Sequence, residues 1–599
     1  MLSSERPLER FEVLLKRFGS KLSLLCVIAA AVYFYKLPSM SHNTYVSENA
    51  LAPGYADARF DRTDVAWAVE LSLELGNLCS TDPATENASL AALERALGRM
   101  DVQPHRQTWR RLDGSAAVNV YGRLVAPRSD GTEAVLLSAD LCNADSVALV
   151  AALVRMHRNA QHLSKDVIVV FARTELPYES GVLAYLQRYH GASGMHGRAV
   201  DADDVVTWGK IRGGLHVDAS NAAGPSGNAG GKRAQSVALA VLAEGIDGQL
   251  PNLDLINAMV RIGRRRGAAL VLSRSPHASP VTVPGTTVGE QAFWDTVLPF
   301  AAHMAHGRTT GAHGFIQRFD VPCVTLGFPG TSGRRMHEEM AASAVLGVMV
   351  EQTLRSLNNL DESLHQSFYD YVLGSPARYV SIGDYLPGVA ILCLALVIAL
   401  YQQRTINALP RATAAMALVT FAFACGACLW TVPRLAGSVV ADGDARSVAA
   451  VLLVAYVLVS LSFLAAGRRL AESVAAAYAP AMGAKDTSLD TTTVHVYTLQ
   501  MVCLCVTAVT LVNFPLGLAT AALITPSQIA VARRSRAVGL PLLLLASPLA
   551  PVYLLSNGDL VAGMVGILRD HAFLNTSLFP VLTLLVVPVN LLSLEVLRR

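Results

Sequence analysis

Long apolar runs constrain this chain more than any other feature of its sequence. A helix needs about 20 mostly apolar residues to cross the hydrocarbon core of a membrane. Eight segments of the 599-residue chain have that length and character. We predict a membrane-spanning helix in each of them: Phe18–Leu37, Ser381–Tyr401, Ala412–Val432, Ser447–Ala466, His495–Val512, Phe514–Ala532, Val538–Ser556 and Ser577–Leu597. The sequence therefore predicts a single anchor over residues 18–37 and a polytopic all-α bundle of about seven helices over residues 381–599.

Two neighbouring runs in the bundle leave an alternative open. They meet at Asn513, and Pro515 and Pro526 interrupt the second of them. Proline removes a backbone hydrogen-bond donor and often ends or kinks a helix. This pair therefore predicts either two full spans or a re-entrant hairpin.

Basic residues between the runs predict how the chain crosses the membrane. Lys and Arg are enriched on the cytoplasmic side of spanning helices. If every run crosses, four basic clusters share a side with the basic residues ahead of Phe18: Arg404 and Arg411; Arg468 and Arg469; Arg533, Arg534 and Arg536; Arg598 and Arg599. We therefore expect residues 1–17 in the cytoplasm and residues 43–377 on the other side. No small-residue cleavage site follows the first run, which favours an uncleaved anchor over a signal peptide.

The composition gives no support to nucleic-acid binding. Only 16% of the residues are charged, and the net charge of +3 is small for this length. No run of Lys and Arg interleaved with aromatic residues follows a groove. We expect membrane partners and no nucleic acid.

The cysteines and the sequons constrain the fold less than the apolar runs do. Cys79, Cys142 and Cys323 lie in the polar part of the chain, and an odd number without CxxC spacing predicts neither a disulfide framework nor a metal cluster. Asn87 and Asn575 each begin an N-x-S sequon and are candidate glycosylation sites.

The polar segment at residues 43–377 reads as a folded α/β domain. Short β-branched runs at residues 134–140 and 166–172 alternate with helical stretches at 146–160 and 181–190. This alternation predicts a mostly parallel sheet flanked by helices. Gly- and Ser-rich stretches at 221–233 and 273–287 predict loops.

Ionisable residues follow the predicted strands, where α/β sheets bind ligands. They are Asp140, Asp145, Glu175, Asp218 and His313. The layout resembles the M28 family of zinc aminopeptidases, whose sites hold two zinc ions. The resemblance implies that Asp145 is the metal-bridging residue and that Glu175, Asp218 and His313 are further ligands.

Two positions depart from the M28 pattern. Ser138 stands where the first ligand His should be, and Thr174 stands where the general-base Glu should be. Without a carboxylate to deprotonate bound water, we expect hydrolysis to be badly impaired. The remaining residues would hold one residual metal ion at most. Alternatively, Asp145 and Asp218 cap helices or loops, and His313 is a hydrogen-bonded histidine.

Longer motifs extend the resemblance over nearly the whole chain. They are NTYVSENALAPG (residues 43–54), EGIDGQLPNLDLIN (244–257), LHQSFYDYVLGSPARYVSIGDYLP (364–387) and NFPLG (513–517). With the anchor, the α/β domain and the bundle, they resemble the attachment-subunit family of glycosylphosphatidylinositol (GPI) transamidase. That family is itself similar to degenerate M28 enzymes, which accounts for the two departures.

The resemblance implies a non-proteolytic subunit of an endoplasmic reticulum complex that replaces a C-terminal signal peptide with a GPI anchor. Its expected partners are the cysteine-protease catalytic subunit, other transamidase subunits, the GPI lipid and the C-terminal signal of the proprotein. We expect this chain to bind and present the lipid from a lumenal domain. It would be a multi-pass glycoprotein with no catalytic residue and, beyond one residual metal ion, no cofactor.

Polar and helix-breaking residues near the predicted membrane surfaces are the candidates for GPI contact. They are Tyr45, Ser47, Glu48, Asn49, Gln366, Asn513, Pro588 and Asn590. Hydroxyl, amide and carboxylate groups suit glycan hydroxyls and an ammonium group. Proline within a span frees a backbone carbonyl, which a bundle tolerates beside a cavity or a polar neighbour. A capped surface linker and a simple packing kink are the alternatives.

Two other functions compete with this hypothesis. An active membrane-anchored M28-type zinc aminopeptidase is favoured by Asp145, Glu175, Asp218 and His313, and opposed by Ser138 and Thr174. A transporter is suggested by the spans alone. Transporters carry ionisable residues within the membrane, and these spans hold almost none.

Overall fold

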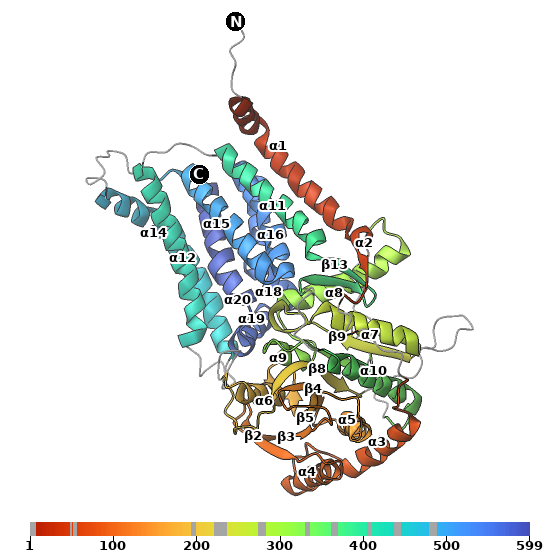
Figure 1. The fold of residues 1–599 in the computed structure, drawn as a ribbon. Helices are drawn as coiled ribbons and strands as arrows, with labels where there is room; N and C mark the ends of the chain where they lie inside the picture. The colour runs from red at the N-terminus through yellow and green to blue at the C-terminus, as the bar shows by residue number, and fades with distance from the viewer. Residues whose placement is uncertain are drawn as a thin grey trace. The chain divides into compact units, whose positions relative to one another are not determined.

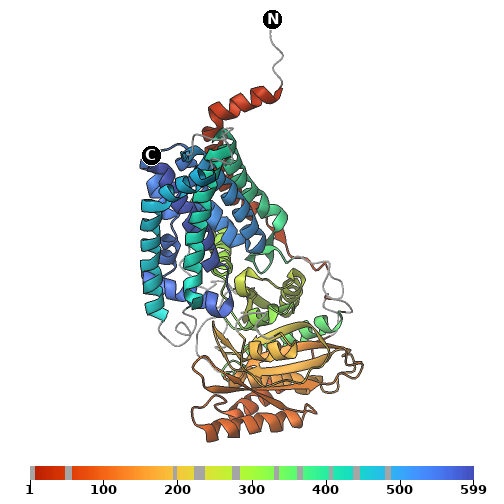
Figure 2. The same cartoon turned by 90° about the vertical axis from the view of Figure 1, so that its left-hand side faces the viewer.

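The computed structural model describes residues 7–47, 51, 57–192, 199–220, 237–272, 283–329, 336–360, 369–403, 409–435, 445–478, 488–556 and 558–598. These residues form two compact units, shown from two sides in Figures 1 and 2. We call residues 40–382 the α/β unit, and residues 1–39 with 383–599 the helical unit. The domain predicted at residues 43–377 lies inside the α/β unit.

An eight-stranded sheet is the framework of the α/β unit. Its strand order is β10-β9-β11-β8-β4-β5-β3-β2. The four central strands are parallel, as are β9 and β10, whereas β9 runs antiparallel to β11, and β3 runs antiparallel to β5 and β2. The strands are β2 (His105–Arg110), β3 (Ala116–Leu124), β4 (Glu133–Asp140), β5 (Asp166–Ala172), β8 (Lys210–Asp218), β9 (Val237–Leu242), β10 (Ala268–Val271) and β11 (Cys323–Gly327). The predicted α/β class is confirmed, with a parallel centre and antiparallel flanks.

The central strands follow directly from their sequence. β5 reads DVIVVFA and is buried at every residue, as a parallel strand covered on both faces must be. It pairs in register with β4, where Leu136 lies opposite Ile168. The helix α5 (Ala144–His157) follows β4, and the Asn143 side chain caps it by accepting from the amide of Ser146.

Helices cover both faces of the sheet (Figure 1). α5 and α10 pack against each other and against β4, while α6 packs against α9 and against β3 and β5. The helices of this unit are α3 (Arg62–Leu75), α4 (Pro83–Gly98), α5, α6 (Gly181–Tyr189), η2 (Ile246–Gly248), α7 (Leu253–Arg266), α8 (Val288–His306), α9 (His313–Gln317) and α10 (Met340–Asn358). A short hairpin of β6 (Thr174–Glu175) and β7 (Glu179–Ser180) precedes α6.

A second, small sheet holds the two ends of the α/β unit together. β1 (His42–Asn43) pairs antiparallel with β13 (Arg378–Ser381), which pairs with β12 (Tyr371–Ser375). The amide of Thr44 also donates to the carbonyl oxygen of Ala377 at 3.1 Å. The short helix α2 (Leu37–Met40) leads into β1. The chain therefore enters and leaves this unit through adjacent strands.

Cys79 and Cys142 form a disulfide, so the prediction of no disulfide framework was wrong. The bridge joins the segment after α3 to the turn between β4 and α5, across 63 residues of sequence. Cys323 is the third cysteine of the polar segment, and it is buried in β11 with a free thiol. The odd count hid the pair, because Cys323 serves as a small buried side chain in the sheet.

Seven helices in the described part of the helical unit are long and apolar enough to cross a membrane. They are Arg17–Tyr35, Ile382–Gln403, Ala412–Pro433, Arg446–Tyr478, Thr491–Val512, Phe514–Ala532 and Leu578–Leu597. The helices of this unit are α1 (Pro7–Tyr35), α11 (Ile382–Gln403), α12 (Leu409–Leu435), α14 (Ala445–Tyr478), α15 (Thr491–Val512), α16 (Phe514–Ala532), α17 (Arg536–Leu545), α18 (Leu549–Leu555), α19 (Leu560–Arg569), η4 (Asp570–Leu574), α20 (Leu578–Pro580), η5 (Val581–Val586) and α21 (Val587–Leu597). Both segments around Asn513 have the length of a full span.

The eighth predicted run, Val538–Ser556, is not one helix. It is divided into α17 and α18, with a break at residues 546–548. Pro548 has no amide hydrogen, so it cannot continue the hydrogen-bond ladder of α17. The apolar composition of this run therefore predicted its location and missed its break.

Basic residues gather at one end of the helical unit. The Arg533 side chain donates to the carbonyl oxygen of Ser20, Arg536 donates to that of Leu597, and Arg598 donates to that of Leu464. These contacts bring the cluster at Arg533–Arg536 next to the cluster at Arg598 and to the first span, and Arg598 next to the helix that carries Arg468. Spans that all cross the membrane would produce this arrangement.

Candidate functional site

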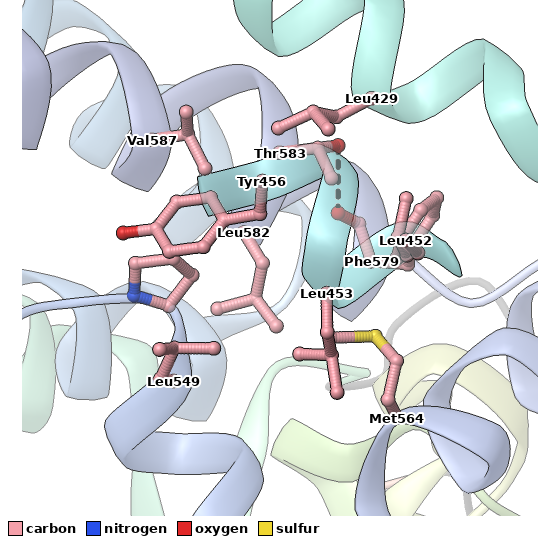
Figure 3. A pocket seen from close by; sticks show the side chains of 11 residues that line it. Leu429, Leu452, Leu453, Tyr456, Leu549, Met564, Phe579, Leu582, Thr583 and Val587 are labelled. Atoms are coloured by element: carbon pink, nitrogen blue, oxygen red, sulfur yellow. Dashed lines mark hydrogen bonds between the residues drawn. The ribbon is translucent and has the colours of Figure 1, made fainter. Parts of the chain in front are cut away.

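A narrow apolar cavity lies in the helical unit where two helices depart from regular geometry (Figure 3). It measures about 30 Å³. Its lining comes from α12, α14, α19, the start of α18 and the last span: Leu429, Leu452, Leu453, Tyr456, Pro548, Leu549, Met564, Phe579, Leu582, Thr583 and Val587. The Thr583 hydroxyl donates to the carbonyl oxygen of Phe579 at 2.9 Å, so this wall is effectively apolar.

The last span contains a π-helical segment, η5, directly before Pro588. π-turns are rare and often mark functional places in helices. Pro588 lacks the amide hydrogen that would bond a carbonyl one turn earlier. An ideal Cβ on Gly426 of α12 would lie 2.3 Å from the carbonyl oxygen of Thr583 and 3.1 Å from Cγ of Pro588. Only glycine at position 426 lets α12 approach this backbone so closely.

Asn590 contacts the broken helix. Its Nδ2 donates to the carbonyl oxygen of Ala546 at 2.8 Å and to that of Val586 at 3.2 Å. Ala546 lies at the break between α17 and α18. Both amide hydrogens of Asn590 therefore serve the bundle itself, and Oδ1 is the atom left to meet a ligand.

Asn513 caps the helix that follows it. Its Oδ1 accepts from the amide of Leu516 at 3.2 Å, and the residue is 2% exposed. This contact makes Asn513 the N-cap of α16, a role that the sequence analysis did not predict. Asn513 is therefore buried within the described part of the helical unit.

The four residues that resemble M28 ligands do not form a metal site. His313 is 0% exposed, and its two ring nitrogens lie 2.8 Å from Oγ1 of Thr325 and 3.0 Å from the carbonyl oxygen of Glu244. Asp145 accepts from the hydroxyl of Ser72 at 2.5 Å and from the amide of Met336 at 3.1 Å. These contacts agree with the alternative of structural hydrogen bonds.

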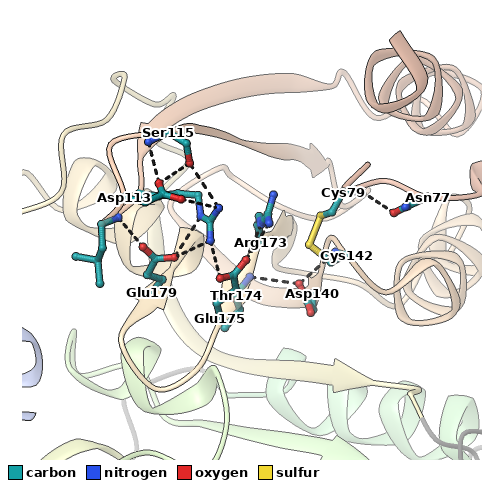
Figure 4. Close-up of polar contacts among 12 residues, drawn as sticks. Asn77, Cys79, Asp113, Ser115, Asp140, Cys142, Arg173, Thr174, Glu175 and Glu179 are labelled. Carbon is teal, nitrogen blue, oxygen red and sulfur yellow. Dashed lines mark hydrogen bonds and ion pairs between the residues drawn. A yellow bond between two sulfur atoms is a disulfide. The ribbon is translucent and has the colours of Figure 1, made fainter. Parts of the chain in front are cut away.

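The other two candidates point to different partners. Asp218 accepts from the amide of Ser220 at 2.9 Å, which makes it a cap of the turn after β8. Glu175 is paired with Arg111 at 2.6 Å and with Arg173 at 2.9 Å (Figure 4). In the part of the chain that the structure describes, no group of three or more His, Cys, Asp or Glu side chains is placed to hold a metal. The residues present therefore do not fit the residual metal ion.

Ser138 and Thr174, the two residues that depart from the M28 pattern, also make hydrogen bonds within the fold. Ser138 is buried in β4, with its Oγ 3.0 Å from Nδ1 of His216 on the neighbouring strand. The amide of Thr174 donates to Asp140, as does the amide of Cys142 (Figure 4). Burial, with a smaller contribution from the nearby carboxylate of Asp218, raises the pKa of Asp140 to about 6.

Three sequence motifs meet beside the small sheet of the α/β unit. Nδ2 of Asn257 donates to the carbonyl oxygen of Tyr45 at 2.5 Å, and Asp254 accepts from the amide of Ser47 at 3.0 Å. The hydroxyl of Tyr371 donates to the carbonyl oxygen of Pro251 at 2.8 Å. We call these contacts the motif junction. It brings Tyr45 and Ser47 onto α7, while the Tyr45 side chain stays 51% exposed.

A buried acid lies next to the motif junction. Glu244 accepts from the hydroxyl of Thr310 at 3.0 Å and is 3% exposed. Burial raises the pKa of Glu244 to about 7. The remaining GPI candidates Glu48, Asn49 and Gln366 lie outside the described residues.

Both candidate glycosylation residues are exposed. Asn87 lies on α4, and Asn575 follows η4 in a left-handed conformation with φ 54°.

Sequence reasoning missed Gly426, Tyr456 and Asn257. Gly426 gave no signal, because a glycine within an apolar run is common. Asn257 lay inside a quoted motif, and its place in a predicted helix was the available signal.

The fold and these sites define a polytopic membrane protein that carries an α/β domain. The family model described as Gaa1-like, GPI transamidase component, matches residues 116–594. The chain belongs to this family.

Curated relatives agree with the family. The GPI transamidase component GAA1 of Saccharomyces cerevisiae is 24% identical over 390 residues, which cover 63% of this chain and 56% of that protein. The corresponding component of Schizosaccharomyces pombe is 26% identical over 400 residues, which cover 64% of each chain. The chain thus matches less than two thirds of the length of these relatives.

Solved structures also show some likeness to this chain. A zinc-dependent exopeptidase from Bacteroides vulgatus is 14% identical with a TM-score of 0.29, and covers 50% of this chain and 99% of its own. A glutaminyl cyclase from Porphyromonas gingivalis is 12% identical with a TM-score of 0.31, at the same coverage. Neither score supports a residue-by-residue correspondence.

Proposed function

We propose that this chain is the non-proteolytic subunit of a GPI transamidase complex that binds the GPI lipid and presents it to the C-terminus of proproteins. Family membership supports the assignment to that complex. The proposed partners are a cysteine-protease catalytic subunit, the other subunits, the lipid and the proprotein signal. The α/β unit serves binding and positioning.

The apolar cavity beside η5 is the observation that carries this proposal. A membrane bundle normally fills its interior with side chains. Here a proline break and a π-turn leave space between α14, α18 and the last span. With a volume of about 30 Å³, close to that of one water molecule in the liquid, the cavity accepts a single apolar group at the end of an acyl chain, and the lipid itself lies on the outer helix surfaces.

The disulfide supports a lumenal location for the α/β unit. Disulfides persist in oxidising compartments such as the endoplasmic reticulum lumen and are rare in the cytosol. The gathered arginines at one end of the helical unit support a cytoplasmic location for that end. Together they favour the predicted orientation in the endoplasmic reticulum membrane, with the N-terminus in the cytoplasm.

Filling the cavity tests the proposal. Leu453→Trp would overfill the cavity with an indole, whereas Val454→Trp changes the neighbouring residue, whose side chain is 58% exposed. In cells that depend on this chain, we expect Leu453→Trp to lose most GPI-anchored reporter from the cell surface while the complex still assembles. We expect Val454→Trp to retain the reporter. Equal reporter levels for both variants, with intact complexes, would contradict the proposal.

A further inference from the structure

A second cavity lies at the arginine-rich end of the helical unit. It measures about 330 Å³ and is polar on several sides. It is lined by the end of α11, the start of α15, the end of α16 and one residue of α21: Gln402, Gln403, Thr491, Thr492, His495, Val531, Ala532, Arg534 and Val596. This volume is ample for a phosphate group and its neighbouring atoms.

Arg534 supplies the cavity with a positive charge. Its guanidinium donates to Oγ1 of Thr492 at 2.9 Å and to Oγ1 of Thr491 at 3.3 Å. Among the described residues, no carboxylate pairs with Arg534. A guanidinium is suited to bind phosphate oxygens through two parallel hydrogen bonds.

His495 forms an uncharged wall of the cavity. It lines the cavity and is 1% exposed. Its Nδ1 lies 2.6 Å from Oε1 of Gln403, whose Nε2 donates to the carbonyl oxygen of Ala532. Since Gln403 offers its carbonyl oxygen, Nδ1 carries the hydrogen. The buried Nε2 of His495 has no hydrogen bond of normal length, and the neighbouring side chain of Gln528 interacts with this ring. The polar contacts for a phosphate therefore come from Arg534, Thr491 and Thr492.

The surroundings favour a lipid over a soluble anion. Leu394, Val397 and Tyr401 are exposed on α11 at helical spacing, and the stripe ends next to Gln402. An acyl chain would lie along such a stripe while its head group enters the cavity. Basic pockets between spanning helices bind the head groups of anionic lipids.

We propose that this cavity binds the phosphate of an anionic phospholipid head group, with Arg534 as its main contact. The site is distinct from the apolar cavity beside η5, and its occupant is a bilayer lipid. It goes beyond the proposed function, because the lipid here is a resident ligand that holds α11, α15 and α16 together.

Lipid binding to the purified full chain tests the site. The protein is mixed with detergent micelles that contain phosphatidylglycerol or phosphatidylcholine, and retained lipid is counted by native mass spectrometry. We expect phosphatidylglycerol to be preferred, and Arg534→Gln to weaken its binding on the order of tenfold. The matched control is Arg533→Gln, which removes the same charge from a side chain bound to Ser20. We expect it to change binding less than twofold.

Further arms keep the test decisive. Ala532→Leu occupies part of the cavity without changing any charge, and we expect it to weaken binding even if Arg534→Gln fails to fold. Equal losses in Arg533→Gln and Arg534→Gln would show a general basic surface and overturn the site. Inorganic phosphate at matched concentration should not displace the lipid. Full displacement would assign the cavity to a free anion and overturn the lipid.

Discussion

Nδ2 of Asn590 lies 2.8 Å from the carbonyl oxygen of Ala546, so a side chain of the last span satisfies a backbone group at the break in another helix. Unsatisfied carbonyls are costly within a membrane. A break between α17 and α18 therefore depends on a polar residue in a different helix. The cavity beside η5 lies next to this break.

Replacing Asn590 by leucine should destabilise the bundle. The change leaves the carbonyl oxygen of Ala546 without its donor, at a cost of about 1 kcal/mol. We expect a lower thermal midpoint for the full chain in nanodiscs and faster hydrogen exchange around Ala546. Ser473→Ala is the control, because that exposed hydroxyl only bonds the carbonyl oxygen of Arg469 in its own helix. An unchanged midpoint for Asn590→Leu would refute the role given to Asn590.

Gly426 should tolerate no side chain. A methyl group there meets the carbonyl oxygen of Thr583 at 2.3 Å, so Gly426→Ala should push α12 away from the last span at a cost of about 1–3 kcal/mol. Gly467→Ala on α14 is matched to it, since the nearest atom to its added methyl lies 3.4 Å away. Thermal unfolding of the two variants makes the comparison. Similar thermal midpoints for the two variants would show that α12 and the last span leave room for a methyl group at position 426.

Removing the side-chain contacts of the motif junction should loosen the entry of the chain into the α/β unit. Asn257→Leu loses the hydrogen bond to Tyr45 and should cost about 1–3 kcal/mol. We expect faster hydrogen exchange at residues 44–47. Arg261→Leu changes an exposed residue of the same helix and should leave exchange there unaltered. Slow exchange in Asn257→Leu would mean that the small sheet alone holds this segment.

The disulfide should stabilise the α/β unit. Replacing both Cys79 and Cys142 by serine should lower its stability by about 2–4 kcal/mol, because the unfolded chain regains the freedom of a long loop. Thermal unfolding measures the loss. Cys323→Ser introduces a hydroxyl at a buried free thiol and controls for the substitution itself. Wild-type protein in reductant should behave like the double variant, and full stability in reductant would contradict the prediction.

Acid should destabilise the α/β unit through His157. Burial lowers the pKa of His157 from 6.5 to about 4. Between these two values the unfolded chain binds a proton that the folded chain does not, so stability falls as pH drops from 6.5 towards 4. At pH 4.5 the loss is on the order of 2–3 kcal/mol. Unfolding midpoints at pH 7 and pH 4.5 measure it.

His157→Gln is the matched variant for this pH dependence. It should start less stable at pH 7 and lose less between pH 7 and pH 4.5. The same loss in both proteins would assign the acid sensitivity to other groups.

The sequence predicted the regular elements better than the sites. β5 was predicted at Asp166–Ala172 and lies there, because a continuous β-branched run with a polar residue before it has few alternatives. The break at Pro548 was readable from that proline and was overlooked. The π-turn at Val581–Val586 was not readable, since its apolar residues fit a regular helix equally well.

The candidate site residues depended on contacts that residue type does not reveal. Asp145 and His313 matched an M28 pattern by position in the sequence, yet each is held by its own hydrogen bonds. Asn590 was chosen as a polar residue near a proline, and its partner Ala546 is 44 residues away. Spacing along the chain carries no information on such pairs.

The small sheet of β1, β13 and β12 has a consequence for how such proteins change over evolution. His42, where the chain enters the α/β unit, pairs with Tyr379, where the chain leaves it, although almost the whole unit lies between them in the sequence. Removing the residues between β1 and β13 would delete most of the α/β unit and leave the spans before and after it unchanged in number. Any insertion or replacement of this unit during evolution would have to preserve the pairing of β1 with β13.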